Sequence, residues 1–308
     1  MANPMISDQW PRFVLPIIRK EWDQSMNAVA SPLMSLLGVQ SSTSSVEYSQ
    51  GVGTFGLVPE YNSATAEGAP AAIQYDSFSP LFESTFTHKE YTKGVSIERK
   101  LVDDNRTGQI LRKAQSLGHS FGTTRAYHAS SILNNAFATV TGSDSVYLCS
   151  ATHNVSETDG SHISNLGTTA LSYAAVVATL LAGADMDDDR GYPMPSIYNV
   201  LYVPTALQAK AFEIVNAIGK PEGANNDANF IATQGIRVVV DPYLTDANNW
   251  FMIDSAQCAM HCLWFNRVLP EISLDPSSDY NLVAKYRGYM RYSFGWDDFR
   301  FIYGHAVT

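Results

Sequence analysis

A periodic pattern over residues 106–138 constrains this chain most, because it predicts a single helix of about nine turns. The side chains on its apolar face recur three or four residues apart, or seven apart at one step. They are Ile110, Ala114, Leu117, Phe121, His128, Ile132 and Ala136. At 1.5 Å per residue this helix is about 50 Å long, more than the diameter of a small domain.

Three glycines fall inside this predicted helix, namely Gly108, Gly118 and Gly122. Each of them weakens a helix interior by roughly 1 kcal/mol relative to alanine. Packing against the rest of the chain must therefore hold the helix. Residues 103–105, Asp-Asp-Asn, are expected to cap its first turn and to complement the helix dipole.

The first 45 residues predict an arm. Residues 8–24, DQWPRFVLPIIRKEWDQ, suggest a short helix with Pro11 in its first turn and Ser7 or Asp8 as its cap. Pro16 is expected to break or kink it. Because the segment is short, broken and followed by the Ser-rich QSSTSSV, we expect it to lie on a surface rather than to form a core.

Residues 46–99 predict an oversized two-stranded hairpin with a long loop as its tip. Its second half alternates with period 2 through Phe82, Phe86 and His88, and the alternation resumes at Val95 and Ile97. The tip is rich in Gly, Ala, Ser and Pro and shows no helical period. Since an isolated hairpin is marginally stable in water, something else must hold this one.

The chain after the long helix predicts a second, mixed lobe. We expect a helix over 168–183 capped by Thr168 or Thr169, a strand over 197–203, and a helix over 204–217 with proline in its first turn. Strands are expected over 236–244 and 250–255. The tail, 290–305, alternates and changes phase at Asp297-Asp298, which indicates a turn or bulge. The fold class is therefore α+β.

Composition limits the function. Only 16% of residues are charged, below the usual quarter, which suggests that much of the surface meets other protein. The net charge of −10 and the absence of a basic run argue against a reader of nucleic-acid sequence, although loose proximity to nucleic acid stays open. Three cysteines make no disulfide framework. No secretory signal or membrane-length apolar run is visible, which is typical of a soluble cytoplasmic product.

Residues 147–154, YLCSATHN, raise the question of a thiol active site. A nucleophilic pair would need Cys149 beside His153, with Asp159 or Asn154 to orient the imidazole. The segment matches no hydrolase signature and lacks a strand-to-helix elbow. We therefore predict a polar loop without catalytic residues, and expect Cys149→Ser and His153→Ala to leave assembly largely intact.

Three further clusters are weighed as metal sites. CAMHC (258–262) offers Cys258, His261 and Cys262 but has no second ligand pair, so buried cysteines are the better interpretation. MDDDRG (186–191) and WDDF (296–299) gather carboxylates but lack the pattern of a calcium loop, so we expect turns. No catalytic, cofactor-binding or metal residue is predicted, and no cofactor is expected.

Six segments, taken in order, carry a family resemblance. They are YTKGVSIERKLVDDN (91–105), LCSATHN (148–154), SNLGTTALS (164–172), LYVPTALQAKAFEI (201–214), VVDPYLTDANNWFMID (239–254) and YRGYMRYSFGWDDFRFIYGH (286–305). The chain resembles the tailed-phage major capsid proteins of the Hong Kong 97 type, and more narrowly the Mu-like major head subunit group. The match covers most of the chain from about residue 85, and the part before it matches in organisation only.

The resemblance implies a domain plan. Residues 1–45 would be an N-terminal arm and 46–98 an extended E-loop hairpin laid over an adjacent subunit, which would supply the partner that the hairpin lacks. Residues 99–170 and 286–308 would form the P-domain, with the spine helix at 106–138. Residues 171–285 would form an α/β A-domain that packs around five-fold and six-fold axes.

The same resemblance implies a structural protein, not an enzyme, that self-assembles into pentamers and hexamers of an icosahedral virion shell in the host cytoplasm. Expected partners are a separate scaffolding protein, a portal protein, possible decoration proteins and packaged DNA held without sequence-specific binding, with no membrane. Residues 51–88 contain no lysine, so we expect no Lys–Asn cross-link between subunits. Rival interpretations are an encapsulin-like nanocompartment shell, a thiol hydrolase using Cys149 and His153, and a tail or baseplate protein.

Overall fold

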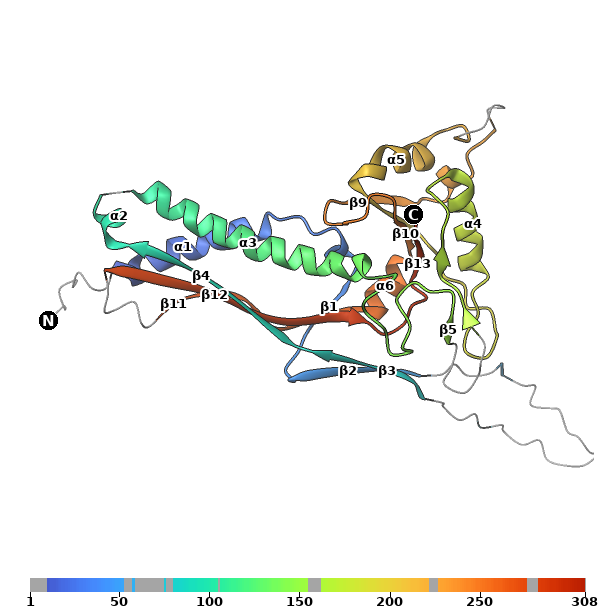
Figure 1. Cartoon of the computed structure of the whole chain (residues 1–308), viewed down its shortest axis with the longest axis horizontal. Helices are drawn as coiled ribbons and strands as arrows, with labels where there is room; N and C mark the ends of the chain where they lie inside the picture. The colour runs from blue at the N-terminus through green and yellow to red at the C-terminus, as the bar shows by residue number, and fades with distance from the viewer. Residues whose placement is uncertain are drawn as a thin grey trace, which may run out of the picture.

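The fold is organised along one long helix, α3 (Thr107–Asn134), as predicted, although it ends four residues before position 138. The computed structural model describes residues 10–52, 57–58, 75, 80–104, 106–154, 162–221, 227–275 and 282–307. Within these residues, no helix combines the length and apolar character that crossing a membrane requires. Figure 1 shows α3 extending along a long lobe and ending at a second, rounder lobe.

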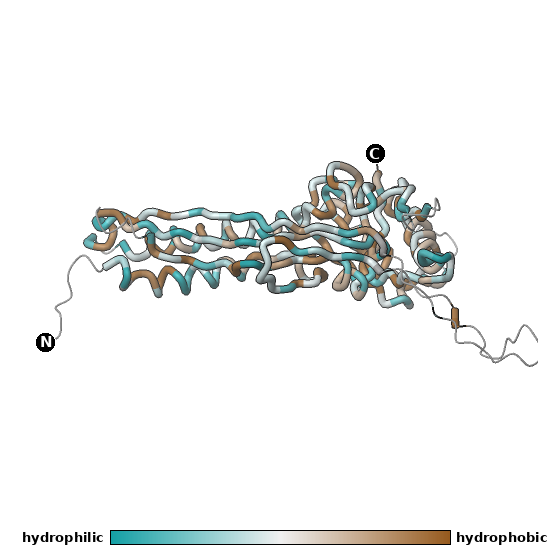
Figure 2. The backbone as a smooth tube through the Cα atoms, turned by 90° about the horizontal axis from the view of Figure 1, so that it is seen from below, coloured by the Kyte–Doolittle hydropathy of each residue, from teal (hydrophilic) through white to brown (hydrophobic). Residues whose placement is uncertain are grey.

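A four-stranded sheet underlies α3 in the long lobe, in the order β1-β11-β12-β4. Its strands are β1 (Gly38–Ser41), β4 (Lys89–Glu98), β11 (Cys262–Leu274) and β12 (Val283–Trp296). The strands run side by side along this lobe (Figure 2). Inward-facing residues of β12, such as Tyr286 and Met290, are buried and join one core cluster with Phe121 of α3.

The N-terminal helix differs from its expectation. α1 (Trp10–Asn27) contains Pro16 and continues through it, and its residues Ile18 and Trp22 are buried in the main core. The Trp22 ring meets Phe121 edge-on, with centroids 5.5 Å apart. Burial of these side chains offsets the roughly 3 kcal/mol that an interior proline costs, so the prediction of a broken surface arm is wrong for this helix.

The predicted hairpin is present, but its second strand divides between two sheets. β2 (Val46–Val52) pairs antiparallel with β3 (Pro80–Thr87) as a separate two-stranded ribbon, while β4 begins directly after His88 and joins the long sheet. Most of the tip, residues 53–79, and its aromatic residues Phe55, Tyr61 and Phe78, lie outside the described residues.

The second lobe is built on a five-stranded sheet in the order β7-β13-β10-β8-β9. Its strands are β7 (Leu166–Gly167), β8 (Val200–Pro204), β9 (Arg237–Asp241), β10 (Trp250–Ile253) and β13 (Ile302–His305). Helices α4 (Tyr173–Ala184) and α5 (Gln208–Asn216) contribute to its separate core. The expected turn at Asp297 is confirmed, because there the chain leaves the long sheet for the second one.

The remaining elements are short. They are α2 (Arg99–Asp103), α6 (Ser255–His261), β5 (His153–Asn154), β6 (His162–Ile163) and the 3₁₀ turns Leu33–Ser35, Thr205–Leu207 and Ile231–Thr233. Strand β11 belongs to the long sheet although it lies within residues 171–285, the range predicted for the A-domain. Strand β13 belongs to the second sheet although it lies within residues 286–308, a range predicted for the P-domain. The sheets therefore divide the chain differently from the ranges 171–285 and 286–308.

Two predicted helix caps are wrong. Ser172, not Thr168 or Thr169, caps α4, and its hydroxyl accepts from the backbone N–H of Ala175 at 3.1 Å. The N-cap of α3 is Arg106, which makes no side-chain cap bond, because residues 99–103 form α2 and take Asp103 into it. Asn105 lies outside the described residues.

Candidate functional site

The base of the β2–β3 hairpin docks on the end of the long sheet of its own chain. Phe86 points inward from β3 and packs against Phe265 with ring centroids 5.3 Å apart, and Leu263 completes this small core. Opposite Phe86 stands Gly295, where a Cβ would lie 2.8 Å from the ring. The expectation that a neighbouring subunit supplies the hairpin's missing partner is thus wrong for the base, because the same chain supplies it.

Polar contacts reinforce this docking. The Ser84 hydroxyl donates to the backbone carbonyl of Trp296 at 3.2 Å, and the Ser49 hydroxyl donates to Oδ2 of Asp297 at 2.5 Å. The other oxygen of Asp297 lies 3.0 Å from Nδ1 of His261 on α6. This hydrogen bond raises the pKa of His261 above its ordinary value, against the opposing effect of burial. Asp297 therefore joins the hairpin, the sheet and α6.

His88 occupies the point where β3 ends and β4 begins. Its Nε2 and Nδ1 lie 3.0 Å from the hydroxyls of Ser42 and Ser293 respectively. Because the Ser42 hydroxyl donates to Glu47, it accepts from Nε2–H, and Nδ1 is left to accept from Ser293. Burial, and next the charge of Arg291, lower the pKa of His88. A neutral imidazole thus joins both legs of the hairpin to the sheet.

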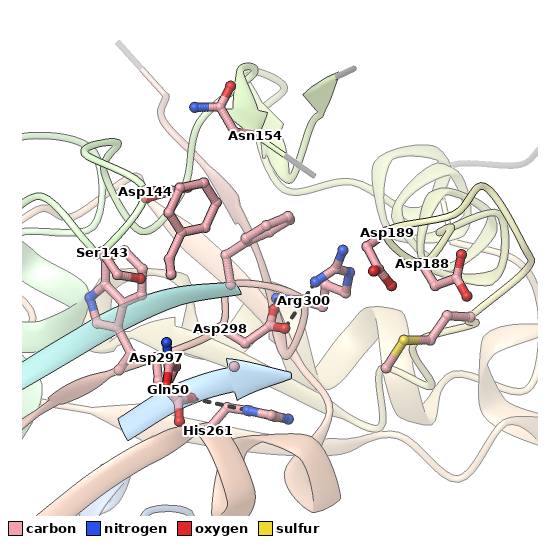
Figure 3. Close-up of a pocket in the computed structure, with 15 residues that line it drawn as sticks. Gln50, Ser143, Asp144, Asn154, Asp188, Asp189, His261, Asp297, Asp298 and Arg300 are labelled. Carbon is pink, nitrogen blue, oxygen red and sulfur yellow. Dashed lines mark hydrogen bonds and ion pairs between the residues drawn. The ribbon is translucent and has the colours of Figure 1, made fainter. Parts of the chain in front are cut away.

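A pocket of about 290 Å³ opens beside this base (Figure 3). It lies among β2, β3, the loop after α3, the 187–194 segment and the turn after β12. Its apolar walls are formed by Phe82, Met194, Trp296 and Phe299. Five aspartates also line it, and they are Asp144, Asp188, Asp189, Asp297 and Asp298.

The carboxylates in this pocket have partners in their own chain. Figure 3 shows Asp297 directed at His261 and Asp298 at Arg300, whose Nη1 lies 2.9 Å from Oδ2. Asp188 accepts the backbone N–H groups of Arg190 and Tyr192, each at 2.8 Å. Carboxylates held in this way serve to fix loops, and they are poorly placed to act as general acids or bases.

His153 is a buried structural residue of the loop after α3. Its Nδ1 lies 2.6 Å from Oδ2 of Asp144 and its Nε2 lies 3.2 Å from the Leu148 carbonyl. Its ring stacks on Phe299 at 3.8 Å between centroids. With both nitrogens engaged, the imidazole has no free position for activating the thiol of Cys149.

Cys149 points toward a different part of the core. It is buried, and a Cβ added at Gly304 would lie 2.6 Å from its Sγ. Burial raises the pKa of the thiol well above its ordinary value. Asn154 lines the pocket instead of orienting His153, and Asp159 lies outside the described residues.

A comparison with protein families identifies the class of protein to which this chain belongs. A family model described as phage capsid protein matches residues 82–304. The chain belongs to the phage capsid protein family. The α+β capsid fold expected from the sequence is thereby confirmed, and this capsid protein is a structural subunit. No curated protein matches its sequence.

Solved structures share the fold of this capsid protein at low identity. A chain of Microbacterium phage Oxtober96 is 12% identical, with a TM-score of 0.55 over 90% of this chain and 91% of that one. The virus-like particle from Pyrococcus furiosus is 9% identical, with a TM-score of 0.56 over 94% and 98%. The capsid of bacteriophage JBD30 decorated with minor capsid protein trimers is 16% identical, with a TM-score of 0.53 over 70% and 91%.

The other predicted clusters of the capsid protein are structural. Cys258 and Cys262 are free, buried thiols, while the ring of His261 lies against Asp297. The 186–191 segment is a turn in which Gly191 has a φ of 78°. Within the described ranges, no group of three or more His, Cys, Asp or Glu side chains is arranged to hold a metal ion.

Asn165 is a structural residue that the sequence reading missed. It is fully buried, and its amide group donates to the carbonyls of Leu148, Phe299 and Ile302 at 2.8, 3.3 and 3.2 Å. Its carbonyl oxygen accepts the Ser150 N–H at 2.8 Å. Asn165 therefore ties the loop after α3 to the turn between the two sheets. Only its position in the SNLGTTALS segment could have drawn attention to it.

Alkylation should distinguish a structural thiol from a catalytic one. At neutral pH we expect an alkylating reagent to leave Cys149 unmodified in the folded subunit, because the thiol is buried and its pKa is raised. Unfolding in denaturant should expose it, and peptide mass spectrometry locates the label. Cys258 and Cys262, also buried, serve as internal controls. Rapid labelling of Cys149 alone would restore the thiol-enzyme interpretation.

A buried histidine in the second lobe should make this capsid protein acid-sensitive. His305 stacks on Trp250 at 3.9 Å, and burial lowers its pKa from 6.5 to about 4. Since the unfolded chain protonates first, stability is full above pH 6.5 and falls as the pH drops toward 4. The loss reaches about 2 kcal/mol at pH 5 relative to neutral pH.

Denaturant unfolding at a series of pH values measures this loss. His305→Phe keeps an aromatic ring on Trp250 and should flatten the pH dependence below 6.5. His162→Gln replaces an exposed histidine and should leave the dependence unchanged. Equal slopes for His305→Phe and the natural sequence would assign the acid sensitivity to other groups.

Proposed function

We propose that this chain is the major head subunit of a tailed phage of the Hong Kong 97 type, in its Mu-like group. Copies of it would close into an icosahedral shell of pentamers and hexamers, assembled in the host cytoplasm. The observation that carries the proposal is the family match, because residues 82–304 include α3 and most of both large sheets.

The surface supports repeated self-contact. Charged residues are only 16% of the chain, and large apolar side chains stand exposed on separate elements. Tyr48 on β2 is 66% exposed, Leu269 on β11 67%, and Ile218 after α5 95%. Apolar anchors of this kind mark protein interfaces. A subunit surrounded by copies of itself would cover all three regions.

The sheets suggest where the domains of such a subunit lie. The four-stranded sheet with α1 and α3 would be the P-domain, with α3 as its spine, and the five-stranded sheet with α4 and α5 would be the A-domain. The β2–β3 ribbon would be the base of the E-loop. This plan moves α1 from the arm to the P-domain and exchanges β11 and β13 between the two domains.

Further partners follow from the same proposal. A separate scaffolding protein and a portal protein would direct assembly. Decoration proteins are compatible with the fold, since the JBD30 capsid is decorated with minor capsid protein trimers. We expect no Lys–Asn cross-link, because residues 51–88 hold no lysine, and a denaturing gel of mature shells would reveal one.

The main alternative is an encapsulin-like nanocompartment. A virus-like particle from Pyrococcus furiosus shares the fold to the same degree as a phage chain, so the fold by itself does not establish that the shell encloses a phage genome. The family match favours the phage. A thiol hydrolase is disfavoured, because Cys149 is buried and His153 is engaged by Asp144 and Leu148.

Negative-stain electron microscopy of the purified recombinant chain, with light scattering, tests the proposal. We expect closed shells, or rings of five and six subunits. A monomer or dimer that persists after the scaffolding protein is added would contradict the assembly role. A portal or terminase gene beside the gene for this chain would favour a phage, and a cargo peptide bound inside the shell would favour a nanocompartment.

A further inference from the structure

The charges of this chain are unevenly distributed over the fold. Residues 135–261, which include most of the second lobe, contain thirteen acids and four bases. The two helices over the long sheet show the reverse, with six bases and two acids, Glu21 and Asp23. The bases are Arg12, Arg19, Lys20, Arg112, Lys113 and Arg125. A chain of net charge −10 thus carries a basic helix layer, which we define as α1 and α3.

The helix layer is exposed and its cations have no acidic partners in the described part of the chain. All its bases except Arg125 are exposed. The described ion pairs include none of the six, and Glu21 accepts from the amide of Gln115 instead of from a cation. Lys113 reaches only a backbone carbonyl, that of Ser96 at 3.2 Å. Their charge is therefore available to a partner.

The exposed face of α3 lacks the anchors of a protein interface. From Thr107 to His119 its exposed residues are polar, basic or glycine, and the first exposed aromatic residue is Tyr127. Protein–protein interfaces are organised around buried aromatic or aliphatic side chains. A face with cations, hydroxyls and amides but no acid is suited to phosphate oxygens.

The helix layer also has a defined place in the molecule. Figure 1 shows α1 and α3 on one side of the long sheet and the β2–β3 hairpin on the other. At about 1.5 Å per residue, α3 extends over more than one turn of a DNA duplex. Cations spread along such a length can neutralise several phosphates without reading a base.

We propose that the helix layer is the surface of this capsid protein that contacts packaged duplex DNA, by non-specific binding to the phosphate backbone. The inference rests on the proposed role as a shell around a genome. It assigns the helix side of the long lobe to the interior of the shell. Each subunit binds weakly, and the many copies in a shell make the sum large.

Fluorescence anisotropy of a short labelled duplex, titrated with the full chain in its unassembled form, tests this proposal. The variant Arg112→Gln/Lys113→Gln removes two cations from the helix layer. The matched control Lys285→Gln/Arg287→Gln removes two exposed cations from β12, in the same lobe. All four side chains are exposed, so circular dichroism melts should show that both variants fold normally.

We expect the helix-layer variant to bind about tenfold more weakly at low salt, and its log–log salt slope to be smaller by about 2. The control should change affinity less than twofold. Equal losses in both variants would show that only net charge matters and would overturn the proposal, as would absence of binding at low salt. Preferential binding of polyglutamate would instead indicate an acidic protein partner.

The shell experiment keeps the two hypotheses apart. If shells form but the helix-layer variant binds DNA as the natural sequence does, the assembly role stands and the DNA-contact surface is wrong. If the chain binds DNA through the helix layer but never forms shells or rings, the assembly role fails instead. If the helix-layer variant binds DNA normally but cannot assemble, the helix layer is a subunit interface and the proposal is overturned.

Discussion

Replacing Asp241 with alanine should lower the free energy of unfolding by about 3–5 kcal/mol. The carboxylate is fully buried at the end of β9. Its Oδ2 accepts from the hydroxyls of Ser130 on α3 and Tyr202 on β8, each at 2.5 Å, and its Oδ1 accepts the N–H of Tyr243 at 2.8 Å. Alanine would leave two buried hydroxyls and one partly buried N–H without an acceptor.

This carboxylate joins the two lobes, because Ser130 belongs to the long helix while Tyr202 belongs to the second sheet. We therefore expect Asp241→Ala to reduce shell formation as well as stability. Asp241→Asn retains one acceptor oxygen and should cost less. Denaturant unfolding followed by fluorescence and circular dichroism measures both variants.

Asp246→Ala is a matched control on the same connection. Asp246 is exposed and accepts the backbone N–H of Asn248 at 2.8 Å. Its loss should cost about 0.5–1 kcal/mol, which is typical for an exposed cap or turn bond. If Asp241→Ala costs no more than Asp246→Ala, the buried network does not hold the lobes together.

Replacing Gly118 with alanine should destabilise the subunit by about 3 kcal/mol, although alanine is the better helix former. A Cβ at this position would lie 2.3 Å from the backbone carbonyl oxygen of Trp22. That oxygen belongs to α1 and cannot rotate away as a side chain would. The helices would have to separate, and the Trp22–Phe121 contact would be lost with them.

Gly108→Ala provides a control in the same helix. Nothing lies within 4 Å of a Cβ built there, so this substitution should stabilise the protein by about 0.5–1 kcal/mol through helix propensity and a smaller unfolded-state entropy. Opposite signs for the two variants are the expected result in thermal or denaturant unfolding. A stabilising Gly118→Ala would show that α1 does not pack closely on α3.

Gly118 also shows how much of the fold could be predicted from the sequence. The period of α3 identified the helix, because its apolar face repeats over many turns. From the sequence, the glycines of this helix could be interpreted only as destabilising it, because a single sequence does not show which part of the chain packs against them. The close approach of α1 requires glycine at Gly118 and Gly122, and the burial of α1 in the core explains why Pro16 is tolerated. Tertiary packing thus outweighs local helix propensity at Gly118 and at Pro16.

The polar network around Asp241 and the loop after α3 were harder to predict for a related reason. Asp241 ends a strand that the sequence identified, yet its partner Ser130 is far away along the chain. Asp144 and Asn165 are held by backbone groups and by His153, and such bonds leave no periodic signal. Cys149 and His153 stood out by residue type, and their burial gives them packing roles.

The order of strands in the two large sheets has a consequence for protein synthesis. β12 lies between β11 and β4, and β13 lies between β10 and β7. Each is an inner strand translated after all its neighbours, so a nascent chain that has reached α6 exposes unpaired strand edges in both lobes. Neither sheet can close before residues 283–305 leave the ribosome. Chains from interrupted translation would therefore lack a complete lobe and could not be incorporated into a growing shell.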